Sequence, residues 1–363
     1  MAMKRLCGLF VLVAITLTGA RVASAAMWVD QGSSSPVVWD EDEIAAVVAD
    51  GILSTADGDF RPSDALTWGD LANALAAWGH PIAAPLDWSR PVTVRELDAR
   101  LVAALGLQPA AQAIRSGALN AGLKPIPSLG TETVARLVGL RINHPAAQDN
   151  LELLPDQPAT RAEAAYSLAH ALNVSDWQKQ QVLNAALAFT LPVLTTWERT
   201  VLTRALRLVG YPYVWTGTSD KGMQTLWDGT VVPGGFDCSG FVWRVYKLQP
   251  FAGAPALSGV LQGRTTYAMS GEVPASERLP IEALQPADVV FFGSNGPSSK
   301  PADIGHVGIY VGDGWFVHSS DHGVTLEPMT GWYQKRFAWA RRPLAEAGLE
   351  APPGVGPASA PTT

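Results

Sequence analysis

Three side chains in the C-terminal half of the chain have the chemistry of a nucleophile and its base: Cys238, His306 and His318. A cysteine sulfur attacks a carbonyl carbon readily, and a nearby imidazole can take the thiol proton and later give it to the leaving group. A buried structural cysteine is the alternative. The two histidines favour catalysis, with Cys238 as the nucleophile, His306 as the base and His318 as the residue that orients His306.

The segment around Cys238 predicts a helix that starts at the cysteine. Gly234 and Gly235 end a polar stretch, Asp237 is a favoured N-cap residue, and an apolar helical pattern follows. The unpaired N–H groups and the dipole at a helix start stabilise an anion. The sequence therefore predicts that the pKa of the Cys238 thiol is lowered and that the thiolate is accessible.

The two histidines lie in adjacent predicted strands, His306–Val311 and Trp315–Ser319, which are joined by a short turn. A two-residue turn would put His318 on the apolar face of this hairpin. A three-residue loop with Gly314 in the left-handed conformation would gather the hydrophobic residues on one face and place His318 diagonal to His306 on the other. We expect the second register because it leaves one face of the hairpin consistently apolar.

Two alternatives concern the histidines. His322, close to His318 in the sequence, could take its place as the orienting residue. Cys238, His306 and His318 could instead bind zinc, but the chain has no CxxC or HExxH spacing. We therefore expect neither a metal nor another cofactor. Ordinary surface or core positions are expected for the remaining histidines, His80, His144 and His170.

Around the site, the sequence predicts a helix that carries Cys238 and, after it, a series of strands. Apolar runs and alternating patterns predict these strands. The predicted strands are Asp288–Phe292, His306–Val311, Trp315–Ser319, Val324–Pro328 and Phe337–Pro343. The polar, turn-rich segment Thr218–Pro233 is expected to be a loop beside the site.

Residues from about Trp197 to Pro343 resemble the NlpC family of papain-like cell-wall peptidases. The motifs that carry the resemblance are Pro212–Trp215, Phe236–Val242, Pro286–Phe292, His306–Gly312 and Phe316–His318, in matching order and spacing. The resemblance implies an α+β papain-like fold, in which the helix that carries Cys238 packs on an antiparallel sheet. It also implies hydrolysis of peptide bonds in peptidoglycan stems, typically between γ-D-glutamate and a diamino acid. It also implies the roles given above to Cys238, His306 and His318.

A substrate pocket is implied by the same resemblance. In relatives that require a stem with a free N-terminal L-alanine, the positions that match Tyr213, Asp237 and Ser239 line this pocket. Asp237 could pair with a substrate ammonium on physical grounds alone, and a role as helix N-cap does not exclude this. The insert Thr218–Pro233, before Gly235, departs from the family pattern and leaves the substrate open.

The N-terminal half predicts an all-α array of repeats over residues 37–173. A Pro-containing turn, a capping polar residue and an amphipathic helix recur along it. The pattern resembles S-layer homology repeats, helical modules that hold exported proteins to cell-wall polymers, and Thr160–Glu163 fits the motif of that family. Two roles of this half stay open: it could bind a wall polymer, or it could be a helical spacer that binds no ligand. A connecting helix is expected over residues 174–195, before the catalytic domain at 196–343.

Residues 1–25 resemble a signal peptide. Lys4 and Arg5 precede the apolar run Leu6–Leu17, and Ala23–Ala25 is a typical cleavage site. A retained N-terminal anchor is the alternative, although the run is short for a bilayer. We expect a protein that is secreted or associated with the cell envelope, with no later membrane span. A tail over residues 344–363 is rich in Ala, Pro and Gly and is predicted to be disordered.

A net charge of -7 argues against binding to nucleic acid or to anionic lipid. The sequence therefore predicts an exported cysteine endopeptidase whose partners are peptidoglycan stem peptides or muropeptides. Two other functions stay open. One is a wall-binding protein with a silenced cleft, and the other is an acyltransferase on the same fold.

Overall fold

The computed structural model describes residues 40–55, 58–84 and 86–349. The predicted signal peptide, with Cys7 inside it, and residues 350–363 of the predicted tail lie outside the described residues. Within the described part of the chain, no helix combines the length and the apolar character that crossing a membrane requires.

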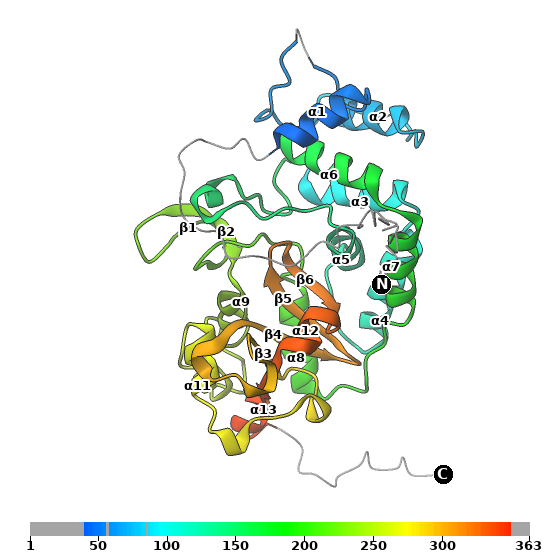
Figure 1. The fold of residues 1–363 in the computed structure, drawn as a ribbon. Coiled ribbons are helices and arrows are strands. Elements are labelled where there is room, and N and C mark those ends of the chain that lie inside the picture. Colours follow the sequence, from blue (N-terminus) through cyan, green and yellow to red (C-terminus); the bar gives the residue numbers. More distant parts are fainter. Residues whose placement is uncertain (1–39, 56–57, 85, 350–363) are drawn as a thin grey trace, which may run out of the picture. The chain divides into compact units, whose positions relative to one another are not determined.

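Helices make up the N-terminal part, as the sequence predicts (Figure 1). They are α1 (Glu41–Ala49), α2 (Trp68–Ala77), α3 (Val94–Ala104), α4 (Gln108–Asn120), α5 (Leu129–Leu137), the 3-10 helix η1 (Ala146–Leu151), α6 (Arg161–Asn173) and α7 (Asp176–Leu187).

Three of these helices begin at capping threonines, where the repeated turns predict helix starts. The side chains of Thr67, Thr93 and Thr160 each accept a hydrogen bond from the backbone N–H three residues later, at the starts of α2, α3 and α6. Such bonds satisfy N–H groups that have no partner inside the helix.

The residues just before the three threonines form a closed ring of backbone hydrogen bonds. The N–H of Leu66 donates to Ala159, that of Ala159 donates to Val92, and that of Val92 donates to Leu66, each at 2.8 Å. The three turns therefore meet at one place, which ties the repeated units into one assembly.

The helix expected over residues 174–195 is shorter than predicted. α7 ends at Leu187 and packs against α4, with Val182 and Ala186 buried. Residues 188–195 form neither helix nor strand, and Phe189 among them is buried, its ring 5.0 Å from that of Trp315. This irregular segment leads to α8 (Thr196–Leu206).

A five-stranded antiparallel sheet follows, with the strand order β6-β5-β4-β3-β7. Its strands are β3 (Val289–Gly293), β4 (Ile304–Gly312), β5 (Trp315–Ser320), β6 (Gly323–Pro328) and β7 (Phe337–Arg341). Each lies close to a predicted strand. The helix α9 (Cys238–Tyr246) packs against β4 and β5, which agrees with the predicted α+β architecture. Short helices α10 (Leu257–Val260), α11 (Thr266–Gly271) and α12 (Gly331–Arg336) fill the connections.

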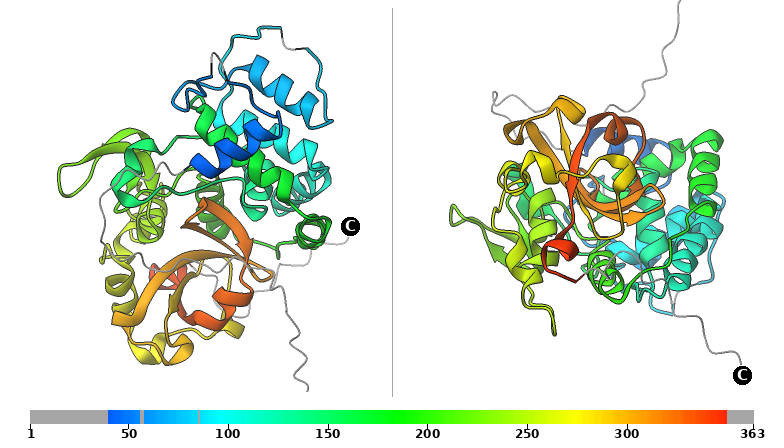
Figure 2. Two further views of the ribbon diagram at one scale, coloured as in Figure 1. Left: turned by 45° about the horizontal axis from the view of Figure 1, so that its top comes forward. Right: turned by 90° about the horizontal axis from the view of Figure 1, so that it is seen from below.

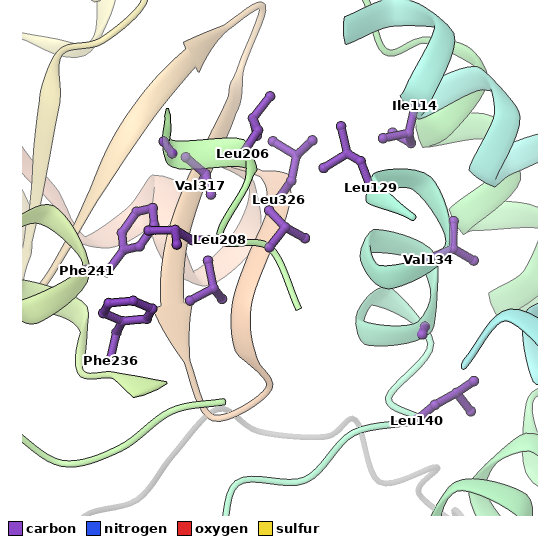
Figure 3. Packing of buried hydrophobic residues seen from close by; sticks show 14 of the residues in the cluster. Ile114, Leu129, Val134, Leu140, Leu206, Leu208, Phe236, Phe241, Val317 and Leu326 are labelled. Carbon is purple, nitrogen blue, oxygen red and sulfur yellow. The ribbon is translucent and has the colours of Figure 1, made fainter. Parts of the chain in front are cut away.

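The two faces of the sheet bury different clusters. Val307, Ile309 and Val317 belong to the larger core, which also contains Phe241 of α9. This core continues into the helical part, where Leu129 of α5 faces the strand β6 (Figure 3). The opposite face of the sheet carries a smaller cluster, whose buried members are Val290, Phe292, Phe316, Met329, Phe337 and Ala340.

The hairpin of β4 and β5 has the predicted faces, but for a different reason. Its turn consists of Asp313 and Gly314, both with positive φ (48° and 80°), which is the conformation favoured by two-residue hairpin turns. The predicted three-residue loop is therefore wrong. A register irregularity before Gly312 supplies the extra residue instead, so that Ile309 pairs with Val317 and both histidines share one face.

The segment Thr218–Pro233 is not the predicted loop. Most of it forms a hairpin of β1 (Thr218–Thr225) and β2 (Val231–Phe236), which extends away from the larger sheet in every view (Figures 1 and 2). Valine and threonine residues flank an Asp-Gly pair whose glycine, Gly229, has a φ of 88°. This pattern is a hairpin signal, and the polar composition of the segment concealed it.

The first residues of the predicted tail, 344–349, lie within the described part of the chain and are ordered. Pro343–Glu346 forms the short helix α13, and Leu344 is buried. The guanidinium of Arg341 binds the Glu346 carboxylate and holds this helix against the end of β7.

Candidate active site

Cys238 is the first residue of α9, as the sequence predicts. Asp237 caps the helix, since its Oδ1 accepts a hydrogen bond from the N–H of Gly240 at 2.5 Å. A side chain at Gly240 would collide with the carbonyl oxygen of Gly217, 1.9 Å from the position of a Cβ. The cap and this close approach fix the thiol in place, and Cys238 is only 8 % exposed.

The surroundings of Cys238 raise the pKa of its thiol, to about 12. Burial has the largest effect, and the negative charge of Asp237 acts in the same direction. The backbone N–H groups of Ser239 and Val307 hydrogen-bond the sulfur and lower the pKa, but less strongly. The predicted low pKa is therefore wrong, because desolvation outweighs the helix start. The thiol keeps its proton until a base removes it.

The strand β4 carries His306 and packs against α9, the helix that begins at Cys238. His306 directly precedes Val307, whose N–H donates to the cysteine sulfur. The Nε2 atom of His306 lies 2.8 Å from Nδ1 of His318 on β5. Burial, and then the neighbouring His318, lower the pKa of His306 well below its usual value. His306 is therefore a neutral imidazole that can accept a proton.

Glu327 on β6 extends this chain of side chains and was not predicted. Its Oε1 lies 2.5 Å from Nε2 of His318, a residue with no exposed surface. An ionised carboxylate can only accept, so His318 donates from Nε2 and accepts at Nδ1. His306 then donates from its Nε2, which leaves the lone pair of its Nδ1 free. The contacts of Glu327 and His318 thus determine the tautomer of His306. The third member of a catalytic triad has the same effect on its base.

The sequence held one signal for Glu327. β5 and β6 pair so that Phe316 lies opposite Glu327, which places Glu327 on the same face as His318. The strand was predicted, but its register against β5 was not considered. In this register, an acidic residue on the strand after β5 lies on the face that carries His318, and this position would have identified Glu327.

Aromatic rings hold the two histidines in place. The ring of Phe316 stacks on that of His318, with centroids 4.2 Å apart and an interplanar angle of 8°. The ring of Tyr333, on α12, lies 5.1 Å from His318 and 5.9 Å from His306. Burial, and then the charge of Glu327, raise the pKa of Tyr333, so its hydroxyl stays protonated. The imidazoles therefore have little freedom to turn.

The structure brings the predicted pocket residues Tyr213, Asp237 and Ser239 to the start of α9. The Ser239 hydroxyl donates to Asp237 Oδ1 at 2.9 Å. The pKa of Tyr213 is raised well above its usual value, by burial and then by the charges of Cys238 and Asp237, which lie close to its hydroxyl. Tyr213 also pairs with Phe236 through an isolated β-bridge, which anchors its backbone beside α9.

Arg264 joins these residues and was not predicted. Its guanidinium binds both oxygens of Asp237, at 3.1 and 3.0 Å, and donates to the Ser239 hydroxyl at 2.7 Å. It also donates to the carbonyl of Thr216 at 2.9 Å. Thr216 has a φ of 61°, an uncommon conformation for a β-branched residue, so Arg264 stabilises a strained backbone next to the thiol. Much of the Asp237 charge is therefore already balanced within the protein.

His322 does not take the place of His318. Its Nδ1 lies 3.1 Å from the carbonyl oxygen of Arg141, in the helical part of the chain. His144 takes one of the two expected positions, a core position, where it lies between Glu152 and Glu163 at 3.0 and 3.3 Å. Over the described residues, no group of three or more His, Cys, Asp or Glu side chains is arranged to hold a metal ion.

Comparison with known proteins points to one family for the C-terminal part. Residues 210–342 match the model of the NlpC/P60 family. The probable peptidoglycan endopeptidase LytE of Bacillus subtilis is 33% identical over 141 residues, which are 38% of this chain and 32% of LytE. The gamma-D-glutamyl-L-lysine dipeptidyl-peptidase of Bacillus cereus is 31% identical over 139 residues, 38% of this chain and 33% of the relative.

Among solved structures, an NlpC/P60 family protein from Bacillus cereus is 27% identical, with a TM-score of 0.31, and the match covers 43% of this chain and 42% of that protein. The chain thus spans about a third of the length of the curated relatives it matches. The family model and the curated relatives support an NlpC/P60 domain in the C-terminal part, which follows a helical N-terminal region.

Proposed function

We propose that this protein is an exported cell-wall cysteine endopeptidase, which hydrolyses peptidoglycan stem peptides at the bond between γ-D-glutamate and a diamino acid. The proposal is carried by the contacts that link Glu327, His318 and His306, on strands that pack against the helix of Cys238. The names of the matched relatives support the class of substrate. The export of the protein is an expectation from the sequence alone.

In the proposed mechanism, His306 removes the thiol proton as the sulfur of Cys238 attacks the scissile carbonyl carbon. The raised pKa of the thiol and the lowered pKa of His306 both favour a neutral resting pair. The proton therefore moves during attack and is not transferred beforehand. The backbone N–H of Cys238, at the start of α9, binds the developing oxyanion.

Collapse of the tetrahedral intermediate breaks the C–N bond, and His306 gives its proton to the leaving amine. This step leaves a thioester on Cys238. Water then attacks the thioester with His306 as the base, the C–S bond breaks, and the sulfur regains its proton. His318 and Glu327 keep His306 in the tautomer that each step requires.

Tyr213, Asp237 and Ser239 are proposed to line the pocket for the stem peptide. The contacts of Arg264 with Asp237 limit how strongly this carboxylate can attract a free substrate ammonium. Within the described part of the chain, Asp237 Oδ2 accepts only one hydrogen bond, from Arg264, so it can still accept one from a substrate ammonium. We therefore expect only a modest preference for stems with a free N-terminal L-alanine.

The helical part is proposed to bind a wall polymer through its S-layer-homology-like repeats. The closed ring of hydrogen bonds between three equivalent turns supports an array of repeats. Binding of purified cell walls by the protein with Cys238→Ala would test this independently of hydrolysis.

The function is tested by mass spectrometry of muropeptides incubated with the protein and with Cys238→Ala. New fragments that end in γ-D-glutamate, formed only by the native protein, are the expected result. If neither protein forms fragments and the native protein still binds walls, the result favours a wall-binding protein without catalytic activity. Amide products in the presence of an added amine, without hydrolysis, would favour an acyltransferase.

A further inference from the structure

A groove lined by basic residues lies at the opposite end of α9 from Cys238. It has a volume of about 540 Å³ and lies between α8, the turn after α4 and the last turn of α9. Its charged lining consists of Lys124, Arg199, Arg204, Arg207, Arg244 and Asp220. We call this surface the basic groove.

One carboxylate faces five cations in the basic groove. Arg244 binds Asp220 through two hydrogen bonds, at 3.2 and 2.8 Å, and these two charges balance. No other carboxylate lines the groove. The groove thus holds four uncompensated positive charges in a chain whose net charge is -7. Such a concentration of one sign attracts an anion of opposite charge.

The arginines that lack a carboxylate are held by uncharged partners. Arg204 donates to the carbonyl oxygens of Val245 and Gln249, at 2.8 and 2.6 Å, and its guanidinium lies over the ring of Phe251. Arg199 donates to the carbonyl of Leu194 at 2.5 Å. These contacts position the guanidinium groups without neutralising them, so their charge is available to a ligand.

The cations of the basic groove also repel one another. Burial, and then the nearby guanidinium of Arg244, lower the pKa of Arg204 to about 10. An anion between the two would relieve this repulsion. The geometry of the groove, and not this shift, identifies the site.

The lining favours phosphate over other anions. Guanidinium groups offer paired N–H donors that match two oxygens of one phosphate. The hydroxyls of Thr196 and Thr203 lie in the same lining and can donate to further oxygens, whereas that of Thr200 already donates to the carbonyl of Thr196. The volume is in the range of small-molecule sites and exceeds the size of a single phosphate ion.

We propose that the basic groove binds a phosphate-bearing anion, as a second site distinct from the hydrolytic one. The ligand is either a small organic phosphate or a segment of a polyol-phosphate polymer, and both present the same group. Bound there, the ligand bridges α8, the turn after α4 and the end of α9. It thereby connects the helical part of the chain to the helix that carries the nucleophile.

The test is calorimetric titration of the full chain with three probes: pyrophosphate, a poly(glycerol phosphate) chain and poly-glutamate of equal charge. Lys124 and Arg207 are the residues to change, because both are exposed and neither side chain binds a carboxylate. The double variant Lys124→Glu and Arg207→Glu should bind the phosphate probes about tenfold more weakly. The matched control changes two exposed cations outside the groove, Arg115→Glu with Lys335→Glu, and should bind as the native chain does.

Tighter binding of the polymer than of pyrophosphate would identify a polymer as the ligand, and equal binding would identify a small phosphate ester. Three results would overturn the proposal: no saturable binding to the native chain, equal losses in both double variants, or equal binding of poly-glutamate. If the double variant does not fold, the single change Arg207→Gln should still weaken binding several-fold. Binding by Cys238→Ala should be unchanged, which separates this site from the proposed hydrolysis.

Discussion

His144 in the helical part is buried and His306 in the sheet is partly buried, and their neighbours shift their pKa values in opposite directions. Burial lowers the pKa of each. At His144, the hydrogen bond to Glu152 and the charges of Glu152 and Glu163 outweigh burial and raise the pKa. At His306, burial and then the neighbouring His318 both lower the pKa, which falls well below its usual value.

The difference shows how the neighbours of a histidine determine its proton affinity. Carboxylates in direct contact raise the pKa of His144 and link helical segments. At the other histidine, the carboxylate of Glu327 is placed one residue further away, behind His318. Glu327 therefore orients His306 through His318 while His306 itself stays unprotonated.

The largest effect is expected from His306→Ala. Loss of the general base should lower kcat/KM for muropeptide cleavage by roughly 10²–10⁴-fold. The free energy of unfolding should change little, because His306 is only partly buried and makes one side-chain hydrogen bond. Kinetics and urea unfolding measure the two quantities. His322→Ala is the matched control and should keep its activity; a similar loss there would mean that the base has been assigned wrongly.

His144→Ala should reverse this pattern. Removing one partner of a buried ion pair leaves Glu152 and Glu163 without their cation, which costs about 3–5 kcal/mol of stability. Activity per folded molecule should remain close to that of the native chain. Urea unfolding, with kinetics below the transition, tests both parts. Unchanged stability would show that the carboxylates do not need His144.

Glu327→Gln should have a smaller effect on catalysis, roughly tenfold in kcat/KM, by analogy with other carboxylates that orient a functional histidine. Glutamine keeps an acceptor for His318 but removes the charge. Loss of a negative charge lowers the pKa of a nearby imidazole. The acid limb of the kcat/KM profile should therefore move to lower pH. A loss of rate with no movement of the limb would indicate a purely structural role.

The stability of the folded protein should also depend on pH. Burial raises the pKa of Glu152 to about 7, so the folded chain holds this proton more tightly than the unfolded chain does. The pKa of His144 is also raised. Both groups contribute stability at low pH that is lost as the pH rises through their folded pKa values.

The unfolding free energy should thus fall between pH 5 and pH 8, and Glu152→Gln should remove on the order of 2 kcal/mol of that fall. Urea unfolding at several pH values gives both curves. Parallel curves for the two proteins would contradict the role given to Glu152.

Local patterns in the sequence identified the strands, the capped helices and Cys238 at a helix start. These features depend on residues that are close in the chain. Glu327 and Arg264 were missed because strand register and the path of a long connection bring them to the site. The register of β4 and β5 was predicted correctly, although the predicted turn was wrong. Burial of the hydrophobic face determines this register, and a bulge before Gly312 makes it compatible with a two-residue turn.

The thiol pKa is the clearest failure of sequence reasoning. A helix start at Cys238 was predicted correctly, but burial cannot be read from the same residues. Asp237 serves as the cap and at the same time raises the thiol pKa through its charge. The polar hairpin of β1 and β2 was missed for a related reason, because its composition concealed its strand pattern.

The most direct test of the central claim is to trap the acyl group on the protein. A γ-D-glutamyl stem peptide is mixed with the protein, the reaction is stopped with acid within its first turnover, and the peptides are examined by mass spectrometry. The proposed mechanism predicts an acyl adduct on the peptide that contains Cys238, and no adduct with Cys238→Ala. Cleavage of the substrate without an adduct, and at the same rate in Cys238→Ala, would contradict it.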